Sequence, residues 1–210
     1  KDHEVLHESV LPKSAVAKIV DCLPAGRVGL KGPRLGALAV IGSHEDGSHH
    51  YSELTSDGAT WVTSLIQRAG EPLSMTTSWK SLLEKKVHKF VMFTDTEKNW
   101  APMDEVVAML QEKLQRTGVT VLDCGSKQCE ILPPGVNKGT GVQRLLSILN
   151  IDTTAAIACG DGVNDIEMLQ LVAKGVAMGD AHPLAQAAAD VVVAAHNNDG
   201  VAEAIERYVL

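Results

Sequence analysis

Short apolar runs alternate with longer amphipathic segments over the last third of the sequence. The apolar runs at 155–159, 176–178 and 191–193 are predicted strands, and each is followed by a segment that reads as a helix. Strands and helices that alternate at this spacing are joined by right-handed crossovers, so the strands run parallel. The sequence therefore predicts an α/β fold built on a Rossmann-like parallel sheet.

The helical segments around this sheet carry apolar residues on one side. In 138–150 these residues recur at helical spacing and predict a helix packed on its neighbours. They are Val142, Leu145, Leu146 and Leu149. A second helix is expected after Asp165, its predicted N-cap, with Ile166, Leu169 and Val172 directed inward.

Composition limits the partners of the chain. The 210 residues carry a formal charge of -7, and their lysines and arginines are scattered, which indicates neither nucleic acid nor an anionic membrane as a partner. No apolar run approaches the roughly 18 residues that cross a bilayer, so no membrane insertion is expected. The four cysteines lack a C-x-x-C spacing. This favours free thiols in a reducing, intracellular compartment, either the cytoplasm or an organelle such as the plastid stroma.

The middle of the chain has a different pattern. Two apolar runs flank a polar stretch in which Asp46-Gly47 favours a turn, so a hairpin or a strand-loop-strand unit is expected. The predicted elements follow in mixed order, with strands at 35–41, 51–54, 87–93 and 119–122 and helices at 59–69 and 103–116. This order predicts a separate α+β module at 35–130, inserted before the parallel-sheet region.

The loop after the first predicted strand of that region has the sequence Gly160-Asp161-Gly162-Val163-Asn164-Asp165. Strand ends in open α/β sheets are where ligands bind, and the N–H groups at a helix start favour anions. Clustered carboxylate oxygens favour the hard cation Mg²⁺. The loop is therefore a candidate site for a divalent cation beside a phosphate group.

Two sequence motifs occur here in the same order as in a known protein family. The stretch 130–139, with the sequence EILPPGVNKG, precedes the loop 160–165. Together they resemble the C-terminal half of the Cof-type haloacid-dehalogenase-like hydrolases, which carry a type IIB cap. The resemblance implies an N-terminal remnant of the core at 1–34, an inserted α+β cap domain at 35–130 and the C-terminal part of the core at 131–210.

The resemblance also implies a reaction. Family members transfer a phosphoryl group to an aspartate and then to water, with Mg²⁺ between nucleophile and phosphate. By the match, Lys138 contacts the phosphate and the nucleophile, Asp161 binds Mg²⁺, and Asp165 supports the metal directly or through water. The residues implied in shaping the loop are Asn164, Gly160 and Gly162. The implied substrate is a small phosphorylated metabolite, and the alternative for these residues is a solvated lysine, a helix cap and a plain turn.

The sequence departs from the family toward its N-terminus. Family members end their first strand in Asp-x-Asp-x-Thr, whose first aspartate attacks phosphorus and whose second acts as general acid and base. The 210 residues contain no such string, and the helix predicted at 13–23 resembles the helix that follows that strand in relatives. The catalytic strand is then expected upstream of Lys1, and this chain alone is expected to be inactive.

The alternative is a non-catalytic relative, a pseudophosphatase that serves as a structural or regulatory subunit of a larger complex. In this fold the strand of the nucleophile pairs with the strand that carries Asp161, so its absence exposes a sheet edge. An unpaired edge invites pairing with another segment. A protein partner that covers this edge is expected in that case.

Three other polar patterns imitate sites. The segment 44–48, with the sequence HEDGS, follows a predicted strand and imitates the missing motif, but Asp-Gly favours a turn. The segment 93–97 also ends a predicted strand and is expected to be a loop exit within the cap. His44, His49 and His50 are residue types that bind transition metals, although adjacent histidines in a polar loop are more often solvated.

Overall fold

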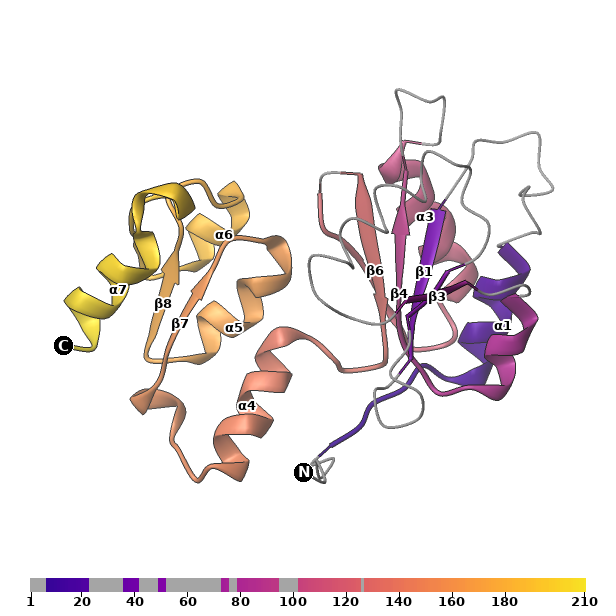
Figure 1. The fold of residues 1–210 in the computed structure, drawn as a ribbon, viewed down its shortest axis with the longest axis horizontal. Helices are drawn as coiled ribbons and strands as arrows, with labels where there is room; N and C mark the ends of the chain where they lie inside the picture. Colours follow the sequence, from indigo (N-terminus) through magenta and orange to yellow (C-terminus); the bar gives the residue numbers. More distant parts are fainter. Residues whose placement is uncertain are drawn as a thin grey trace. The chain divides into compact units, whose positions relative to one another are not determined.

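The structure of the chain is a computed structural model that describes residues 7–22, 36–41, 49–51, 73–75, 79–94, 102–125 and 127–210. For the three short segments between residues 36 and 75 it describes the backbone alone. The chain divides into two compact units, Lys1–Pro134 and Gly135–Leu210 (Figure 1). The division falls close to the boundary that the sequence placed between cap and core.

The first unit is built on a mainly antiparallel sheet. In the described part of the chain this sheet has six strands, in the order β3-β2-β1-β4-β6-β5, and only β2 and β3 run parallel. The strands are β1 (Gly36–Ile41), β2 (His49–Tyr51), β3 (Leu73–Met75), β4 (Val87–Phe93), β5 (Thr120–Asp123) and β6 (Gln128–Leu132). The pairing of β1 with β2 confirms the predicted hairpin, while the helix predicted at 59–69 lies outside the described residues.

Two helices and a 3₁₀ helix share one hydrophobic core with this sheet. They are α1 (Lys13–Cys22), α3 (Met103–Leu114) and η1 (Trp79–Glu84). The helix α1 contacts both η1 and α3. Just before α1, the amide of Leu11 donates a hydrogen bond to the carbonyl oxygen of Val87 on β4, at 2.8 Å.

The position of α1 differs from the predicted domain division. The sequence predicted a helix here, which the structure confirms, and assigned it to a remnant of the core at 1–34. In the structure Ile19 of α1 is fully buried in the same core as Leu82 and Phe90 of the first unit. The helix α1 therefore packs in the core of the first unit, while the division into remnant, cap and core stays a prediction. An amphipathic pattern identifies the apolar side of a helix and not the sheet that it covers.

The second unit is built on a parallel sheet, as the sequence predicted. Its described strands have the order β7-β8-β9 and pair in parallel. The elements are β7 (Ile157–Gly160), β8 (Lys174–Ala177), β9 (Val191–Val192), α4 (Lys138–Ile148), α5 (Ile166–Leu171), α6 (Pro183–Ala188) and α7 (Gly200–Tyr208). Figure 1 shows α5 and α6 on one face of this sheet and α7 on the other.

The core of the second unit is packed by small apolar side chains. Leu169, Val176 and Ala204 are at most 1% exposed. The helix α5 lies directly on β8, because a Cβ atom on Gly175 would lie 2.3 Å from the carbonyl oxygen of Leu169. This tight contact fixes the level at which α5, and the loop before it, meet the sheet.

The apolar side of α4 is less buried than predicted. Leu145 is 51% exposed and Leu149 is 55% exposed, while the other two residues of the predicted stripe are half-buried. The helix contacts α5 at its first turn, where Gly139 lies against the backbone of Glu167. The predicted helix packed on its neighbours is therefore confirmed only in part within the described residues. Periodicity shows which side is apolar but not whether another element covers it.

Candidate functional site

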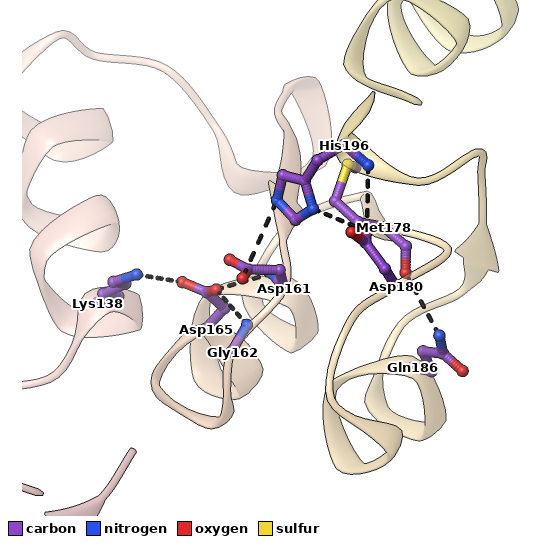
Figure 2. Close-up of polar contacts among 8 residues, drawn as sticks. All are labelled: Lys138, Asp161, Gly162, Asp165, Met178, Asp180, Gln186 and His196. Atoms are coloured by element: carbon purple, nitrogen blue, oxygen red, sulfur yellow. Dashed lines mark hydrogen bonds and ion pairs between the residues drawn. The ribbon is translucent and has the colours of Figure 1, made fainter. Parts of the chain in front are cut away.

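The carboxyl-terminal ends of the three parallel strands lie at one edge of the second unit. Gly160 pairs with Ala177, and Ala177 pairs with Val192, so the loops that follow β7, β8 and β9 begin at the same level. Such an edge is where open α/β sheets bind ligands. Three polar residues from these loops are drawn together in Figure 2: Asp161, Asp180 and His196.

The start of α4 positions Lys138. The side chain of Asn137 accepts a hydrogen bond from the amide of Thr140 at 2.7 Å, and the hydroxyl of Thr140 accepts one from the amide of Asn137 at 3.0 Å. This reciprocal capping box fixes the residue at which the helix begins. Lys138 is the first helical residue, and its amine forms an ion pair with Asp165.

Asp165 is the buried centre of the loop after β7. It is 3% exposed. Its Oδ1 accepts a hydrogen bond from Nζ of Lys138, and its Oδ2 accepts one from the amide of Asp161 and one from the amide of Gly162, both at 2.9 Å (Figure 2). Burial raises the pKa of Asp165, but the hydrogen bonds from Lys138 and the two amides outweigh it and lower the pKa below the ordinary 3.8.

The lowered pKa of Asp165 predicts that the second unit is sensitive to acid. A carboxyl whose pKa is depressed by folding contributes stability above its unfolded pKa, and this contribution is lost as the pH falls through the folded value. We expect the free energy of unfolding to decrease below about pH 4. Urea unfolding at about pH 7 and about pH 3 measures it, and Asp165→Asn is expected to lose this part of the pH dependence. A variant that keeps the whole acid-induced loss would contradict the assignment to Asp165.

The two glycines of the loop are required by close contacts. A Cβ atom on Gly160 would lie 2.6 Å from Cβ of Asp165, and one on Gly162 would lie 2.6 Å from Oδ1 of Asn164. Neither glycine has a positive φ, so the close contacts and not a left-handed backbone require glycine at these two positions. The contact with Gly162 puts Asn164 against the loop that it was predicted to shape.

Asp161 is the carboxylate of the motif that stays open to solvent. Its side chain is 59% exposed, whereas that of Asp165 is 4% exposed. Mg²⁺ keeps several waters and is commonly held by one or two carboxylates together with substrate phosphates. The residues fit such an ion in part: Asp161 supplies one solvent-exposed carboxylate, and no group of three or more His, Cys, Asp or Glu residues in the described chain forms a metal cage.

Asp165 is engaged by other groups of the protein, and its support of the metal, directly or through water, stays a prediction. Both of its oxygens are already engaged within the protein, by Lys138 and by the backbone of the loop. It stands at the N-cap position of α5 without making the side-chain cap hydrogen bond that the sequence predicted. In this geometry Asp165 holds the amine of Lys138 and the backbone of the loop that carries Asp161.

Sequence reasoning missed Asp180 and His196. Oδ1 of Asp180 lies 2.7 Å from Nδ1 of His196, and Nε2 of the same ring lies 4.0 Å from Oδ2 of Asp161. Both residues follow predicted strands whose carboxyl-terminal ends share one edge with that of Asp161. A search of every strand-end loop for polar side chains would have found them.

The other polar patterns contribute nothing to this cluster within the described residues. The segment 44–48 and the residues 95–97 lie outside the described residues, and Thr94 is buried. His49 and His50 are on β2, where the backbone alone is described.

In the part of the chain that the structure describes, no helix has the length and apolar character to cross a membrane.

Comparison with known proteins identifies the family. The sequence profile of the haloacid dehalogenase-like hydrolases matches residues 1–205. The structure is similar to that of a haloacid dehalogenase-like hydrolase from Bacteroides thetaiotaomicron, with a TM-score of 0.74 and 26% identity, over 97% of this chain and 70% of that one. It is also similar to a subclass IIB sugar phosphatase of the superfamily, with a TM-score of 0.75 and 22% identity, over 98% of this chain and 70% of that one. The chain belongs to the haloacid dehalogenase-like hydrolases, as the Cof-type resemblance implied.

Curated relatives are matched over shorter segments. The chloroplastic endoribonuclease YBEY of Arabidopsis thaliana is 39% identical over 118 residues, which are 56% of this chain and 20% of that protein. A phosphoglycolate phosphatase from Haloarcula marismortui is 36% identical over 106 residues, which are 50% of this chain and 46% of that protein. The chain thus spans less than half the length of these two relatives.

Proposed function

We propose that the second unit is part of a phosphatase site that hydrolyses phosphomonoesters of a small phosphorylated metabolite with Mg²⁺ as cofactor. The observation that carries the proposal is the cluster at the end of β7, where Asp165 joins Lys138 to the backbone of Asp161. Phosphatases among the relatives support it.

The charges of the cluster suit phosphoryl transfer. The transferred group carries negative charge on its oxygens, so positioned cations and N–H donors lower the barrier. The side chain of Lys138 is 50% exposed while its amine is tied to Asp165, so it is held in place and remains accessible to an anion. The start of α4 adds the positive end of a helix dipole beside this amine. A bound Mg²⁺, held by Asp161, would supply further neutralisation of the phosphate charge.

The 210 residues do not contain the Asp-x-Asp-x-Thr motif that supplies the nucleophile in the family. Transfer to an aspartate needs a free carboxylate beside the amine of Lys138, and both oxygens of Asp165 are engaged. Full activity is therefore proposed for a protein in which an Asp-x-Asp-x-Thr strand completes the site. The open reading frame tests this point, since the motif supports the enzyme and its absence supports a non-catalytic relative.

The unpaired edge of β7 in the described sheet supports the non-catalytic alternative. In the described sheet β7 is an edge strand and pairs with β8 alone. A free strand edge is a template for pairing. In this alternative the chain is a subunit of a larger complex whose partner covers β7. It predicts a stable complex without phosphate release, and a monomer by light scattering that turns over substrate would contradict it.

We also propose a cellular compartment for the protein. We place the protein in a reducing compartment, either the cytoplasm or a plastid stroma. Its four cysteines are free thiols in the structure, and Cys129 is buried with a pKa raised to about 12, chiefly by burial. The chloroplastic name of one relative supports the plastid.

Asp161→Asn tests the proposed cofactor site. The change keeps the shape of the side chain and removes the charge that would hold Mg²⁺, so phosphate release is expected to fall by about 100-fold or more. The assay is Mg²⁺-dependent phosphate release by the intact protein from a panel of sugar phosphates, nucleotides and phosphorylated cofactors. Asp104→Asn, at an exposed aspartate of α3 in the first unit, is the matched control. An active protein that is indifferent to Asp161→Asn would contradict the proposed role of this residue.

A further inference from the structure

The loop after β9 places an imidazole beside Asp161 that the proposed chemistry does not use. Oδ1 of Asp180 is 3.1 Å from the backbone amide of His196, which donates to it, and 2.7 Å from Nδ1 of the ring. Figure 2 shows the ring between Asp180 on one side and Asp161 on the other. Two contacts to one carboxylate therefore fix both the backbone and the ring plane of His196.

The contact with Asp180 determines which ring nitrogen carries the proton. An ionised carboxylate only accepts hydrogen bonds, so a neutral imidazole at this distance donates from Nδ1. Asp180 is ionised at neutral pH, since the backbone hydrogen bond from His196, followed by the side-chain hydrogen bond, lowers its pKa. In this neutral form the other nitrogen, Nε2, is an acceptor, and it faces Oδ2 of Asp161, which is also an acceptor.

The distance between Nε2 of His196 and Oδ2 of Asp161 allows one water molecule to bridge them. At 4.0 Å, Nε2 of His196 and Oδ2 of Asp161 are too far apart for a direct hydrogen bond. Two hydrogen bonds of about 2.8 Å that meet at a water oxygen at about 90–110° span about 4 to 4.6 Å. One water can donate a hydrogen to each acceptor, and the side chains of His196 and Asp161 are 48% and 59% exposed, so water reaches this position.

We propose that Asp180 and His196 are a positioning pair that orients the carboxylate of Asp161 through one bridging water. The pair holds Oδ2 of Asp161 and leaves Oδ1 free for a cation. The inference rests on the proposed function, because it takes Asp161 to be the metal-binding carboxylate. Asp161, Asp180 and His196 follow three neighbouring strands, so the loop after β7 is steadied by the other two loops as well as by Asp165.

The protonation of the ring provides a test without metal or substrate. Long-range ¹H–¹⁵N spectra distinguish a proton on Nδ1 of His196 from one on Nε2. We expect neutral His196 to carry its proton on Nδ1 in the wild-type chain and to lose this preference in Asp180→Ala. A ring protonated on Nε2 would overturn the proposal, because Nε2 could not then accept from the bridging water.

Binding of Mn²⁺, a probe that takes the same oxygen ligands as Mg²⁺, tests the consequence for Asp161. In His196→Asn the amide can keep the contact at the Nδ1 position, but nothing replaces Nε2. In His196→Gln the amide reaches toward the Nε2 position. By titration with detection of free Mn²⁺ by electron paramagnetic resonance, we expect His196→Asn to weaken binding about tenfold and His196→Gln to restore most of it. His7→Asn, in the first unit, is the control and is expected to bind as the wild type does.

Asp161→Asn separates the two ways in which this test can fail. If Asp161→Asn abolishes Mn²⁺ binding and His196→Asn leaves it unchanged, the proposed function stands and the positioning pair is overturned. If the wild type binds no Mn²⁺, or Asp161→Asn binds it equally well, the proposed metal site fails. The protonation of His196 then decides by itself whether the ring is held as proposed.

Discussion

Replacing Lys138 with methionine is expected to lower the proposed phosphatase activity by about 10²–10³-fold, the usual cost of removing one positioned charge donor. Methionine keeps an unbranched apolar stem and removes the ammonium group that meets Asp165. The same change is expected to destabilise the second unit by about 1–2 kcal/mol, because a buried carboxylate loses its counterion. The half-exposed position of Lys138 limits this cost through solvent screening.

Lys174→Met is the matched control for this prediction. Lys174 is the first residue of β8, at the opposite edge of the sheet from the site. Its replacement is expected to leave activity unchanged and to alter the free energy of unfolding by less than about 0.5 kcal/mol. If Lys138→Met hydrolyses substrate at the wild-type rate, the placement of the Lys138 amine at the phosphate is wrong.

Gly139→Ala is expected to destabilise the second unit by about 1–3 kcal/mol, as measured by urea unfolding. The added Cβ would lie 2.8 Å from the carbonyl carbon and 2.8 Å from the carbonyl oxygen of Glu167. These are backbone atoms of α5, so α4 must move away from α5 to accept the methyl group. Because Lys138 directly precedes Gly139, the same shift displaces its amine from Asp165, and activity is expected to fall with stability.

The control for this prediction lies one half-turn further along the same helix. A Cβ on Gly141 would meet no heavy atom within 4 Å. Gly141→Ala is therefore expected to stabilise the helix by about 0.5–1 kcal/mol, because alanine loses less backbone entropy than glycine on folding. If Gly139→Ala and Gly141→Ala change the free energy of unfolding in the same direction, the close contact between the start of α4 and α5 is contradicted.

The sheet of the second unit could be predicted because its sequence pattern has one structural solution. The apolar runs that became β7, β8 and β9 are separated by helical segments, and such an alternation leads to parallel strands. The loop after β7 followed from the same reasoning, since Asp161 and Asp165 are only a few residues apart in one motif. Such local sequence patterns determine the structure of the segment that contains them, without contacts to distant residues.

Features that depend on partners distant in the sequence could not be predicted. The helix α1 was recognised as a helix, but its apolar side gave no indication that it packs in one core with Phe90. The apolar stripe of α4 was visible, while the exposure of Leu145 was not. His196 comes to Asp180 only because β8 and β9 are neighbours in the sheet, and the lone residue types carried no signal of that contact.

A crystal structure of the protein grown with Mn²⁺ and inorganic phosphate, with the metal located by anomalous scattering, tests the proposed site. We expect a Mn²⁺ peak bonded to the carboxylate of Asp161, and a phosphate oxygen within hydrogen-bonding distance of the amine of Lys138. We also expect that Asp165 keeps its bonds to Lys138 and to the amides of the loop. A metal bound elsewhere, with Asp161 facing solvent and Lys138 without phosphate, would show that the loop after β7 does not bind cation and phosphate together at one edge of the sheet.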